Sequence, residues 1–340
     1  MRADLPTRSR TVEPLTIVGL GEVLFDVFED GTETLGGAPL NVAVHAHQLL
    51  APLGMGEGVV VSRIGNDRHG RHILDLLERR GMSTRYMQLD HEHPTGRVSV
   101  FMHRGEPGYQ IEPGAAWDFI HESETLDELA ATCSAVCFGS LAQRVSDSRG
   151  SIIQFLQNAP QAVRLYDVNL RRNKLTGEAG YSTEIIEHSC ALATMMKLNI
   201  AELAEICSLF GLDPGWDERE DAVRRGVDLL LNRFPVEYLI LTRAEDGTTL
   251  FARGGEFHGN FPIPKLLDAH PVGAGDACSA GILCGIVLGW TLDATVDLAN
   301  RMGAWVASQL SATPPLAESI LSFVRADLAA QTAMSKQVQR

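Results

Sequence analysis

Two glycines and an aspartate at the start of an apolar helix are the residues of this chain best suited to do chemistry. Val272-Gly273-Ala274-Gly275-Asp276 precedes the run ACSAGILCGIVLGW, which is long and apolar and has small residues in its first turns. Glycine lets the backbone come close to a phosphate, and the first N–H groups of a helix point at an anion bound there. Gly273, Ala274 and Gly275 are therefore predicted to form an anion hole. The alternative, a Gly-rich turn that only starts a helix, stays open on these residues alone.

Other signatures of phosphate or metal chemistry are weaker. The sequence has no G-x-x-x-x-G-K-[ST] motif, and the stretch GLGEVL at residues 19–24 lacks the third glycine of a dinucleotide-binding fingerprint. His45-x-His47 and His91-x-His93 have no nearby cysteine or third ligand, so we interpret them as helix-face or surface residues rather than as a metal site.

The elements that must position the predicted anion hole follow an alternating order. Helical patterns separate short apolar runs that are typical of strands, namely TIVGLGEVLFDVF, VVVSRIG, AVCFGS, RLYDVNL, MMKLNI and EYLILT. This alternation predicts a mostly parallel sheet with helices on both faces. Ligands of such sheets bind at the carboxyl ends of the strands, so the polar residues at those ends are expected to form the site.

Two segments break the alternation. Residues near 22–40 and 90–115 have the pattern of short strands between Gly, Pro and Asp turns. They are predicted to form a small β lid over one end of the sheet. The remaining chain is expected to comprise a disordered N-terminal extension at 1–14, one α/β domain at 15–325 and a C-terminal tail at 326–340.

Composition narrows the classes of protein and partner. The chain has 340 residues, 45% of them hydrophobic and 21% charged, as expected of a globular protein. A formal net charge of −14 argues against nucleic-acid and anionic-membrane partners, which clustered Lys and Arg would bind. No run of about 18 apolar residues is present, so no membrane span is predicted. The six cysteines form no C-x-x-C pair, which favours a reduced, cytoplasmic compartment.

Six motifs, in a shared order, resemble the PfkB, or ribokinase-like, family of sugar kinases. They are the GAGD of residues 273–276, the GGAPLNVA of 36–43, the RIGND of 63–67 with Gly70, the DVNLR of 167–171, the NIAE of 199–202 and the LTRAEDG of 241–247. The resemblance covers about residues 15–320. It implies an α/β fold of the ribokinase-like type, a three-layer sandwich whose central, mostly parallel sheet carries a small β-strand lid.

The resemblance also implies the site residues. The sugar is expected to contact Asp26, Gly36, Gly37, Asn41, Arg97 and Arg171, and ATP to contact Asn199, Thr242, Gly247, Gly275 and Asn300. Asn199 and Glu202 are expected to hold Mg²⁺, although Asn199 as a helix N-cap with Glu202 at its third position also makes a capping box. Both readings of this pair can hold at once.

Asp276 is expected to be the base that activates the accepting hydroxyl. At a helix N-terminus its carboxylate is stabilised, so its pKa is expected to stay low. A weak base suffices for phosphoryl transfer, in which positioning and charge neutralisation matter more than basicity. Gly273, Ala274 and Gly275 would complete the catalytic group.

The activity implied by the resemblance is ATP-dependent phosphorylation of a small sugar, with fructose as the leading substrate because GGAPxN is the form associated with fructokinases. That form also occurs in 2-keto-3-deoxygluconate kinases, which are the alternative within the family. An alternative of another class is a non-catalytic sugar-binding regulator on a kinase fold. The expected ligands are the sugar, ATP and Mg²⁺, and the expected state is a monomer or homodimer.

The chain departs from the family pattern at three places. His270 and Pro271 stand where an Asp-Thr pair usually helps to hold an activating monovalent cation, so weak K⁺ dependence is expected unless a rearranged loop lets Asp268 compensate. Ala244 stands where Gly is common, and Ser311 where a Gly-Ala pair is usual. The loops on the adenine side are therefore expected to differ in detail.

Overall fold

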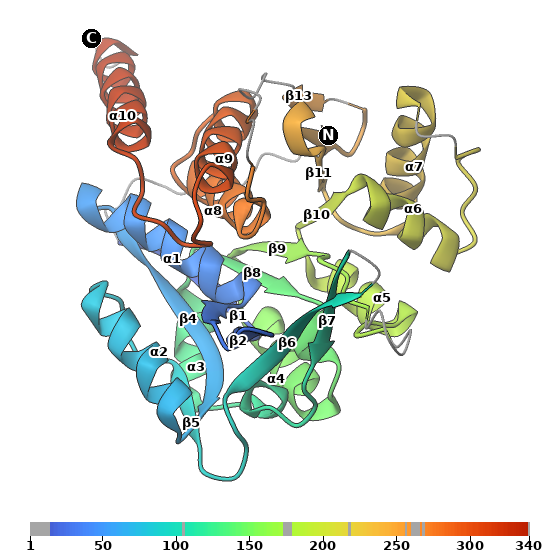
Figure 1. The fold of residues 1–340 in the computed structure, drawn as a ribbon. Coiled ribbons are helices and arrows are strands. Elements are labelled where there is room, and N and C mark those ends of the chain that lie inside the picture. Colours follow the sequence, from blue (N-terminus) through green and yellow to red (C-terminus); the bar gives the residue numbers. More distant parts are fainter. Residues whose placement is uncertain are drawn as a thin grey trace.

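A large, mostly parallel sheet forms the centre of the molecule (Figure 1). The structure, a computed structural model, describes residues 14–103, 106–172, 179–216, 219–255, 257–259, 266 and 269–338. Within these residues the large sheet has nine strands in the order β13-β12-β11-β10-β9-β8-β1-β4-β5. Their bounds are β1 Leu15–Leu20, β4 Gly56–Gly65, β5 Met87–Asp90, β8 Ala135–Gly139, β9 Val163–Asp167, β10 Met195–Asn199, β11 Tyr238–Thr242, β12 Thr248–Ala252 and β13 Phe257–Gly259.

Strand direction changes only at one edge of this sheet. The pairs from β5 through β4, β1, β8, β9 and β10 to β11 are parallel, and β12 and β13 add in antiparallel fashion. The carboxyl ends of seven parallel strands therefore meet along one edge of the sheet, where the sequence predicts the site.

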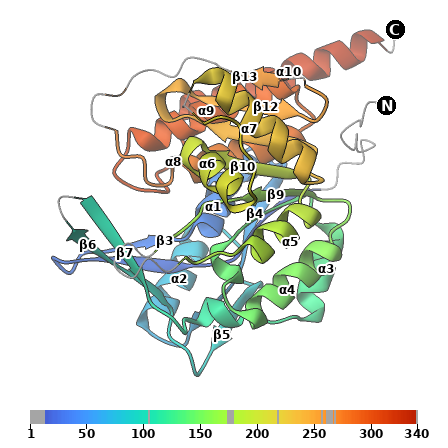
Figure 2. The same cartoon turned by 90° about the vertical axis from the view of Figure 1, so that its right-hand side faces the viewer.

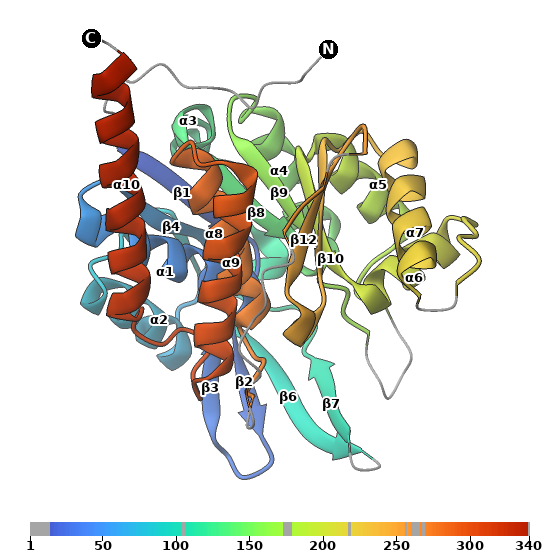
Figure 3. The same cartoon turned by 90° about the horizontal axis from the view of Figure 1, so that it is seen from above.

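Helices cover both faces (Figure 3). One face carries α1 Ala38–Leu50, α2 Arg68–Arg79, α8 Ala274–Val287, α9 Leu292–Ala307 and α10 Glu318–Val338. The other carries α3 Glu124–Thr132, α4 Ser146–Gln157, α5 Thr183–Leu192, α6 Ile200–Leu209 and α7 Glu220–Arg233. Successive strand residues serve opposite faces: Ile17 packs under α1 and α8, and Val18 packs toward α3 and α4.

A second, four-stranded sheet extends beyond the edge of the large one (Figure 2). It has the order β3-β2-β6-β7, with β2 Leu24–Phe28, β3 Glu33–Gly36, β6 Gly96–His103 and β7 Glu106–Ile111. β2 follows β1 after a short link, so the lid starts at the carboxyl end of a central strand. The predicted sheet and β lid are thereby confirmed.

An N-terminal extension and a C-terminal tail were predicted at the two ends of the chain. Residues 1–13 of the predicted extension lie outside the described residues. α10 runs on to Val338, so most of the segment predicted as a tail continues a helix. No helix in the described ranges combines the length and apolar character that crossing a membrane requires.

Candidate active site

The turn that opens α8 has the geometry expected of an anion hole. Gly273 is the N-cap residue with a φ of 82°, and a Cβ there would lie 2.6 Å from the carbonyl oxygen of Ala312. Only glycine fits this position. Ala274, Gly275 and Asp276 form the first helical turn, whose N–H groups have no acceptors within a helix. Gly275 is exposed, so a phosphate can reach this turn.

The sugar-signature segment meets this turn through one hydrogen bond. Gly37 precedes α1 with a φ of 114°, and a Cβ there would lie 2.4 Å from the carbonyl oxygen of Glu22. The close approach places Asn41 in the first turns of α1, where its Nδ2 donates to Oδ2 of Asp276 at 2.8 Å. Residues 235 positions apart in sequence are therefore in direct contact.

The expected low pKa of Asp276 is wrong. Burial raises the pKa of Asp276 from 3.8 to about 6, and the nearby carboxylate of Asp167 adds to the rise. The hydrogen bond from Asn41 and the charges of Lys197 and Arg171 lower this pKa without offsetting the burial. The helix terminus alone suggested a weak base, but the tertiary surroundings make Asp276 a stronger proton acceptor.

A buried ion pair underlies the anion hole. Lys197 in β10 and Asp167 at the end of β9 are register partners, and Nζ of Lys197 donates to Oδ2 of Asp167 at 2.7 Å. Oγ of Ser279 in α8 donates to the same oxygen at 2.8 Å. Burial alone would lower the pKa of Lys197, but Asp167 raises it above its ordinary value, so the cation persists. A Cβ on Gly275 would lie 3.6 Å from Nζ of Lys197, so this positive charge lies beside the turn.

Sequence reasoning missed three polar residues of this region. Lys197, Ser279 and Glu22 carry no motif that marks them, although a charged residue inside each of the apolar runs MMKLNI and TIVGLGEVLFDVF was a signal. Glu22 is 4% exposed, and its Oε2 has no hydrogen-bond partner within the described part of the chain. Burial raises the pKa of Glu22 to about 7, against the lowering effect of Arg171.

The predicted sugar contacts of the lid divide between its two faces. Asp26 is register partner of Val98 in β6, and Arg97 is register partner of Phe25, so Asp26 and Arg97 point to opposite faces of the lid. Burial raises the pKa of Asp26, and the charge of Arg171 lowers it. Arg171 is therefore within electrostatic range of Asp26, whereas strand register puts Arg97 on the other face of the lid.

Gly36 lies on the same face of the lid as Asp26. A Cβ on Gly36 would lie 3.2 Å from Oδ2 of Asp26, a separation that is tight for any larger residue. Arg97 instead lowers the pKa of Glu33 in β3, which is consistent with its place on the other face.

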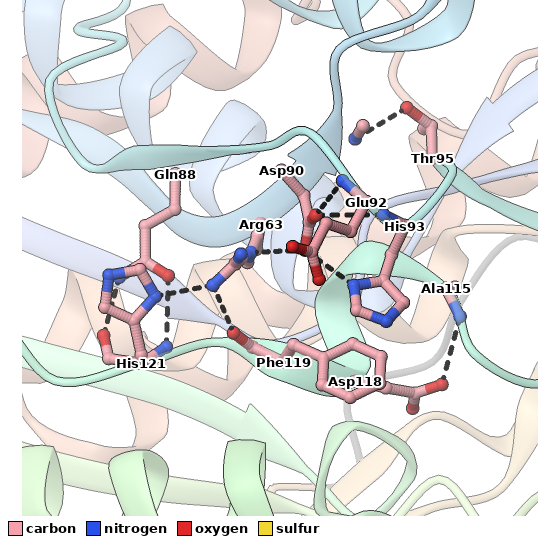
Figure 4. A network of polar contacts seen from close by, with 11 residues as sticks. Arg63, Gln88, Asp90, Glu92, His93, Thr95, Ala115, Asp118, Phe119 and His121 are labelled. Carbon is pink, nitrogen blue, oxygen red and sulfur yellow. Dashed lines mark hydrogen bonds and ion pairs between the residues drawn. The ribbon is translucent and has the colours of Figure 1, made fainter.

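The RIGND motif makes polar contacts at the foot of the lid, and Figure 4 shows those of Arg63. Arg63 pairs with Asp90 through Nε and Oδ2 at 2.6 Å, and its Nη1 donates to the carbonyl oxygen of Phe119 at 2.9 Å. Asp67, the N-cap of α2, accepts hydrogen bonds from N and Oγ1 of Thr95, both at 2.8 Å. β6 begins just after Thr95, so the motif ties the foot of the lid to β4 and α2.

The predicted nucleotide positions lie along β10, β11 and α9. Thr242 ends β11 as register partner of Asn199, and Gly247 follows a 3₁₀ turn at Ala244–Asp246 with a φ of 82°. Asn300 in α9 is buried, and neither Nδ2 nor Oδ1 of its amide meets a partner among the residues described. A buried amide without protein partners is the kind of group that a ligand completes, so Asn300 fits a bound nucleotide.

Asn199 and Glu202 form the capping box that the sequence predicts as one of two roles for this pair, the other being a metal site. Glu202 N donates to Oδ1 of Asn199, and Asn199 N donates to Oε2 of Glu202, both at 2.9 Å. Oε1 of Glu202 accepts from Leu170 N at 2.8 Å. Across the described ranges, no three His, Cys, Asp or Glu side chains gather to hold a metal. The oxygen donors of this pair fit Mg²⁺ that keeps its waters beside phosphates, since such ions use few protein ligands.

The structure shows the local backbone at two of the places where the chain departs from the family pattern. Ala244 has a φ of 46°, so a residue with a Cβ occupies a left-handed conformation where the family commonly has Gly. His270 N donates to the carbonyl oxygen of Ala307 at 2.8 Å, which fixes the loop before α8 to the end of α9. Asp268 lies outside the described residues.

Comparison with known proteins shows the family and the fold. The profile of the pfkB family carbohydrate kinases matches residues 24–319. A fructokinase of Klebsiella pneumoniae is 30% identical over 275 residues, which cover 78% of this chain and 83% of that protein. An aminoimidazole riboside kinase of Salmonella typhimurium is 29% identical over 253 residues, 73% of this chain and 72% of that protein. The crystal structure of a fructokinase with bound ATP from Xylella fastidiosa aligns with a TM-score of 0.75 at 20% identity, covering 92% and 98% of the two chains.

The fold is of the ribokinase-like type. The chain belongs to the pfkB family of carbohydrate kinases. It is an ATP-dependent sugar kinase, which transfers a phosphoryl group to a sugar hydroxyl.

Proposed function

We propose that the sugar is fructose and that Asp276 accepts the proton of the hydroxyl that is phosphorylated. The observation that carries this proposal is the 2.8 Å hydrogen bond from Asn41, in the GGAPLN segment, to Asp276 at the start of α8. It joins the sugar signature to the residue next to the anion hole. A carboxylate whose pKa lies near 6 is ionised at neutral pH and still basic enough to take a proton as the bond to phosphorus forms.

The remaining residues have assigned roles in this proposal. The N–H groups of Gly273, Gly275 and Asp276 at the start of α8 and the ammonium of Lys197 neutralise charge on the transferred phosphoryl group. Mg²⁺ would be held near Asn199 and Glu202, where it would offset phosphate charge. The adenosine would lie between the β11 end at Thr242–Gly247 and Asn300 of α9.

The charge of the sugar side favours a neutral sugar over a keto acid. Burial raises the pKa of Glu22, of Asp26 and of Asp276, and the charge of Arg171 lowers each of them. A sugar that carries its own carboxylate would compete with these acids for Arg171. Fructose presents only hydroxyl groups, which the carboxylates and the Asn41 amide can bind. 2-Keto-3-deoxygluconate therefore remains the second candidate.

A coupled ADP-release assay tests the proposal. The panel comprises fructose, ribose, 2-keto-3-deoxygluconate, tagatose 6-phosphate, aminoimidazole riboside and adenosine, each with ATP and Mg²⁺. Fructose is expected to give the highest kcat/KM. A higher kcat/KM for another sugar would overturn the substrate assignment and leave the kinase intact. Sugar binding by calorimetry without ADP release would instead support a non-catalytic regulator. A monomeric or homodimeric state and a cytoplasmic location remain predictions.

A further inference from the structure

One polar stripe runs along the otherwise apolar helix α1. Asn41, His45 and Gln48 are spaced i, i+4 and i+7, so they share one face of the helix. Asn41 donates to Asp276, Nε2 of His45 lies 2.9 Å from the carbonyl oxygen of Ala312, and Oε1 of Gln48 accepts from Leu316 N at 2.7 Å. The stripe therefore connects α8 with the segment between α9 and α10, which we call the strap (residues 308–317).

His45 acts as a hydrogen-bond donor in this arrangement. Its side chain is 1% exposed, and burial lowers its pKa to about 4, so the ring is neutral at physiological pH. Because its Nε2 faces a carbonyl oxygen, Nε2 must carry the proton. His45, interpreted from the sequence as a helix-face or surface residue rather than a metal ligand, holds the backbone of the strap.

Arg80 holds the next residue of the strap. It follows the last turn of α2, and its Nη2 donates to the carbonyl oxygen of Thr313 at 2.9 Å and to Oγ1 of Thr313 at 3.2 Å. Two consecutive carbonyl groups, of Ala312 and Thr313, are thus fixed by side chains from α1 and α2.

A hollow of about 340 Å³ borders the far end of the strap, lined by His47, Gln48, Ala51, Pro52, Arg80, Leu316 and Leu321. Ala312 does not line this hollow and is 4% exposed. Its carbonyl group is therefore held by packing as well as by the hydrogen bond with His45.

The strap lies directly against the phosphate-binding turn. A Cβ on Gly273 would lie 2.6 Å from the carbonyl oxygen of Ala312 and 2.8 Å from its Cα. The oxygen that His45 binds is thus the same atom against which Gly273 packs. Any shift of Ala312 would move the N-cap of α8 and, with it, the N–H groups of the first turn.

We infer that His45 and Arg80 are positioning residues for phosphoryl transfer, which hold the strap beneath Gly273 and so fix the anion hole at the start of α8. This inference rests on the proposed role of that turn in binding the transferred phosphoryl group. The hydrogen bonds of His45 and Arg80 go to Ala312 and Thr313, so their effect would pass through these two residues. A misplacement of about 1 Å at a reacting group can lower a rate by about 100-fold, so the effect is measurable.

Five variants of the full chain test the inference. His45→Leu removes the donor at similar volume, and His45→Gln keeps an N–H group near the position of Nε2. Arg80→Met and Arg80→Lys form the corresponding pair, the second keeping the charge and a donor. Gln48→Leu is the matched control, because it removes a contact to the far end of the same strap, away from Gly273. Steady-state kinetics, ADP affinity by calorimetry and the folded fraction by circular dichroism are measured for each.

His45→Leu and Arg80→Met are expected to lower kcat by about 10- to 100-fold and to weaken ADP binding, with the KM for sugar nearly unchanged. His45→Gln and Arg80→Lys should recover most of kcat, and Gln48→Leu should lose thermal stability while its kcat stays within about threefold of the parent. If His45→Leu does not fold, Arg80→Met and Arg80→Lys decide by the same criteria.

The inference is overturned if folded His45→Leu or Arg80→Met keeps its parental kcat. It is also overturned if Gln48→Leu loses as much kcat as they do, or if only the KM for sugar changes. A parent protein that releases no ADP with any sugar would instead refute the proposed function.

Discussion

Replacing Asp276 with Asn should make the protein more stable and nearly inactive at the same time. The ionised carboxylate of Asp276 destabilises the folded state, because burial raises its pKa from 3.8 to about 6. An acid whose pKa is higher in the folded state binds its proton more tightly there than in the unfolded chain. This tighter proton binding stabilises the folded state fully at pH values below the pKa of the unfolded chain. The stabilisation is lost as pH rises through about 6, the pKa of the folded state.

The size of the effect follows from the two pKa values. A difference of about 2 pH units corresponds to at most about 3 kcal/mol of destabilisation by the ionised carboxylate at pH 7 and above. Asp276→Asn removes that cost but weakens the hydrogen bond from Asn41, for which about 1 kcal/mol is subtracted. We therefore expect the variant to be about 1–2 kcal/mol more stable at pH 8, with the gain shrinking toward zero near pH 4.

Activity should change in the opposite direction. Asn cannot accept the proton of the sugar hydroxyl, so kcat is expected to fall by about 10²- to 10⁴-fold, while sugar and ATP affinities change little. In the parent, the ionised form is lost below about pH 6, so its kcat should decline as pH falls through that value. ADP release gives kcat between pH 5 and pH 8, and calorimetry gives both affinities.

Unfolding by urea, followed by circular dichroism at pH 4.5, 6 and 8, measures the stability part. Asp30→Asn is the matched control, since Asp30 is exposed and its pKa is lowered by the backbone N–H of Thr32. This control should not gain stability at pH 8. A gain for Asp276→Asn that stayed constant over the pH range would refute the electrostatic reasoning. A variant that kept most of its kcat would show that Asp276 only positions the sugar.

Three further predictions concern other residues. Ala244→Gly should raise the free energy of unfolding by about 0.5–1 kcal/mol, because it relieves a left-handed φ that Gly adopts freely; a less stable variant in urea unfolding would contradict this. Lys197→Met should cost about 3–5 kcal/mol by leaving buried Asp167 without its cation. Adding Asp167→Asn should restore part of that loss, and a single variant as stable as the parent would disprove the pairing argument. Weak K⁺ dependence is expected because His270 replaces a carboxylate; a manyfold rise in kcat on adding K⁺ at constant ionic strength would contradict it.

The elements and the two main motifs were predictable because their signals are local. The alternation of apolar runs with helical patterns predicted the parallel sheet, and short strands between Gly and Pro turns predicted the lid. The glycines of GGAPLN and GAGD predicted where the backbone must pass close to another group, since few other residues accept their φ values or contacts. The Asn199–Glu202 capping box was also predictable, because its members are three residues apart.

Properties that depend on neighbours distant in sequence were not predictable. The pKa of Asp276 in α8 is raised by burial and by Asp167 at the end of β9, and the helix terminus visible in the sequence suggested the opposite direction. Strand register put Arg97 on the far face of the lid from Asp26, since a shift of one residue reverses the face that a side chain occupies. His45 gained its role only when folding brought Ala312 to α1 across 267 positions of sequence. Residue type and local sequence show which side chains are able to act. The pKa, burial and long-range contacts of each side chain depend on neighbours from the whole folded chain, so only the tertiary structure determines them.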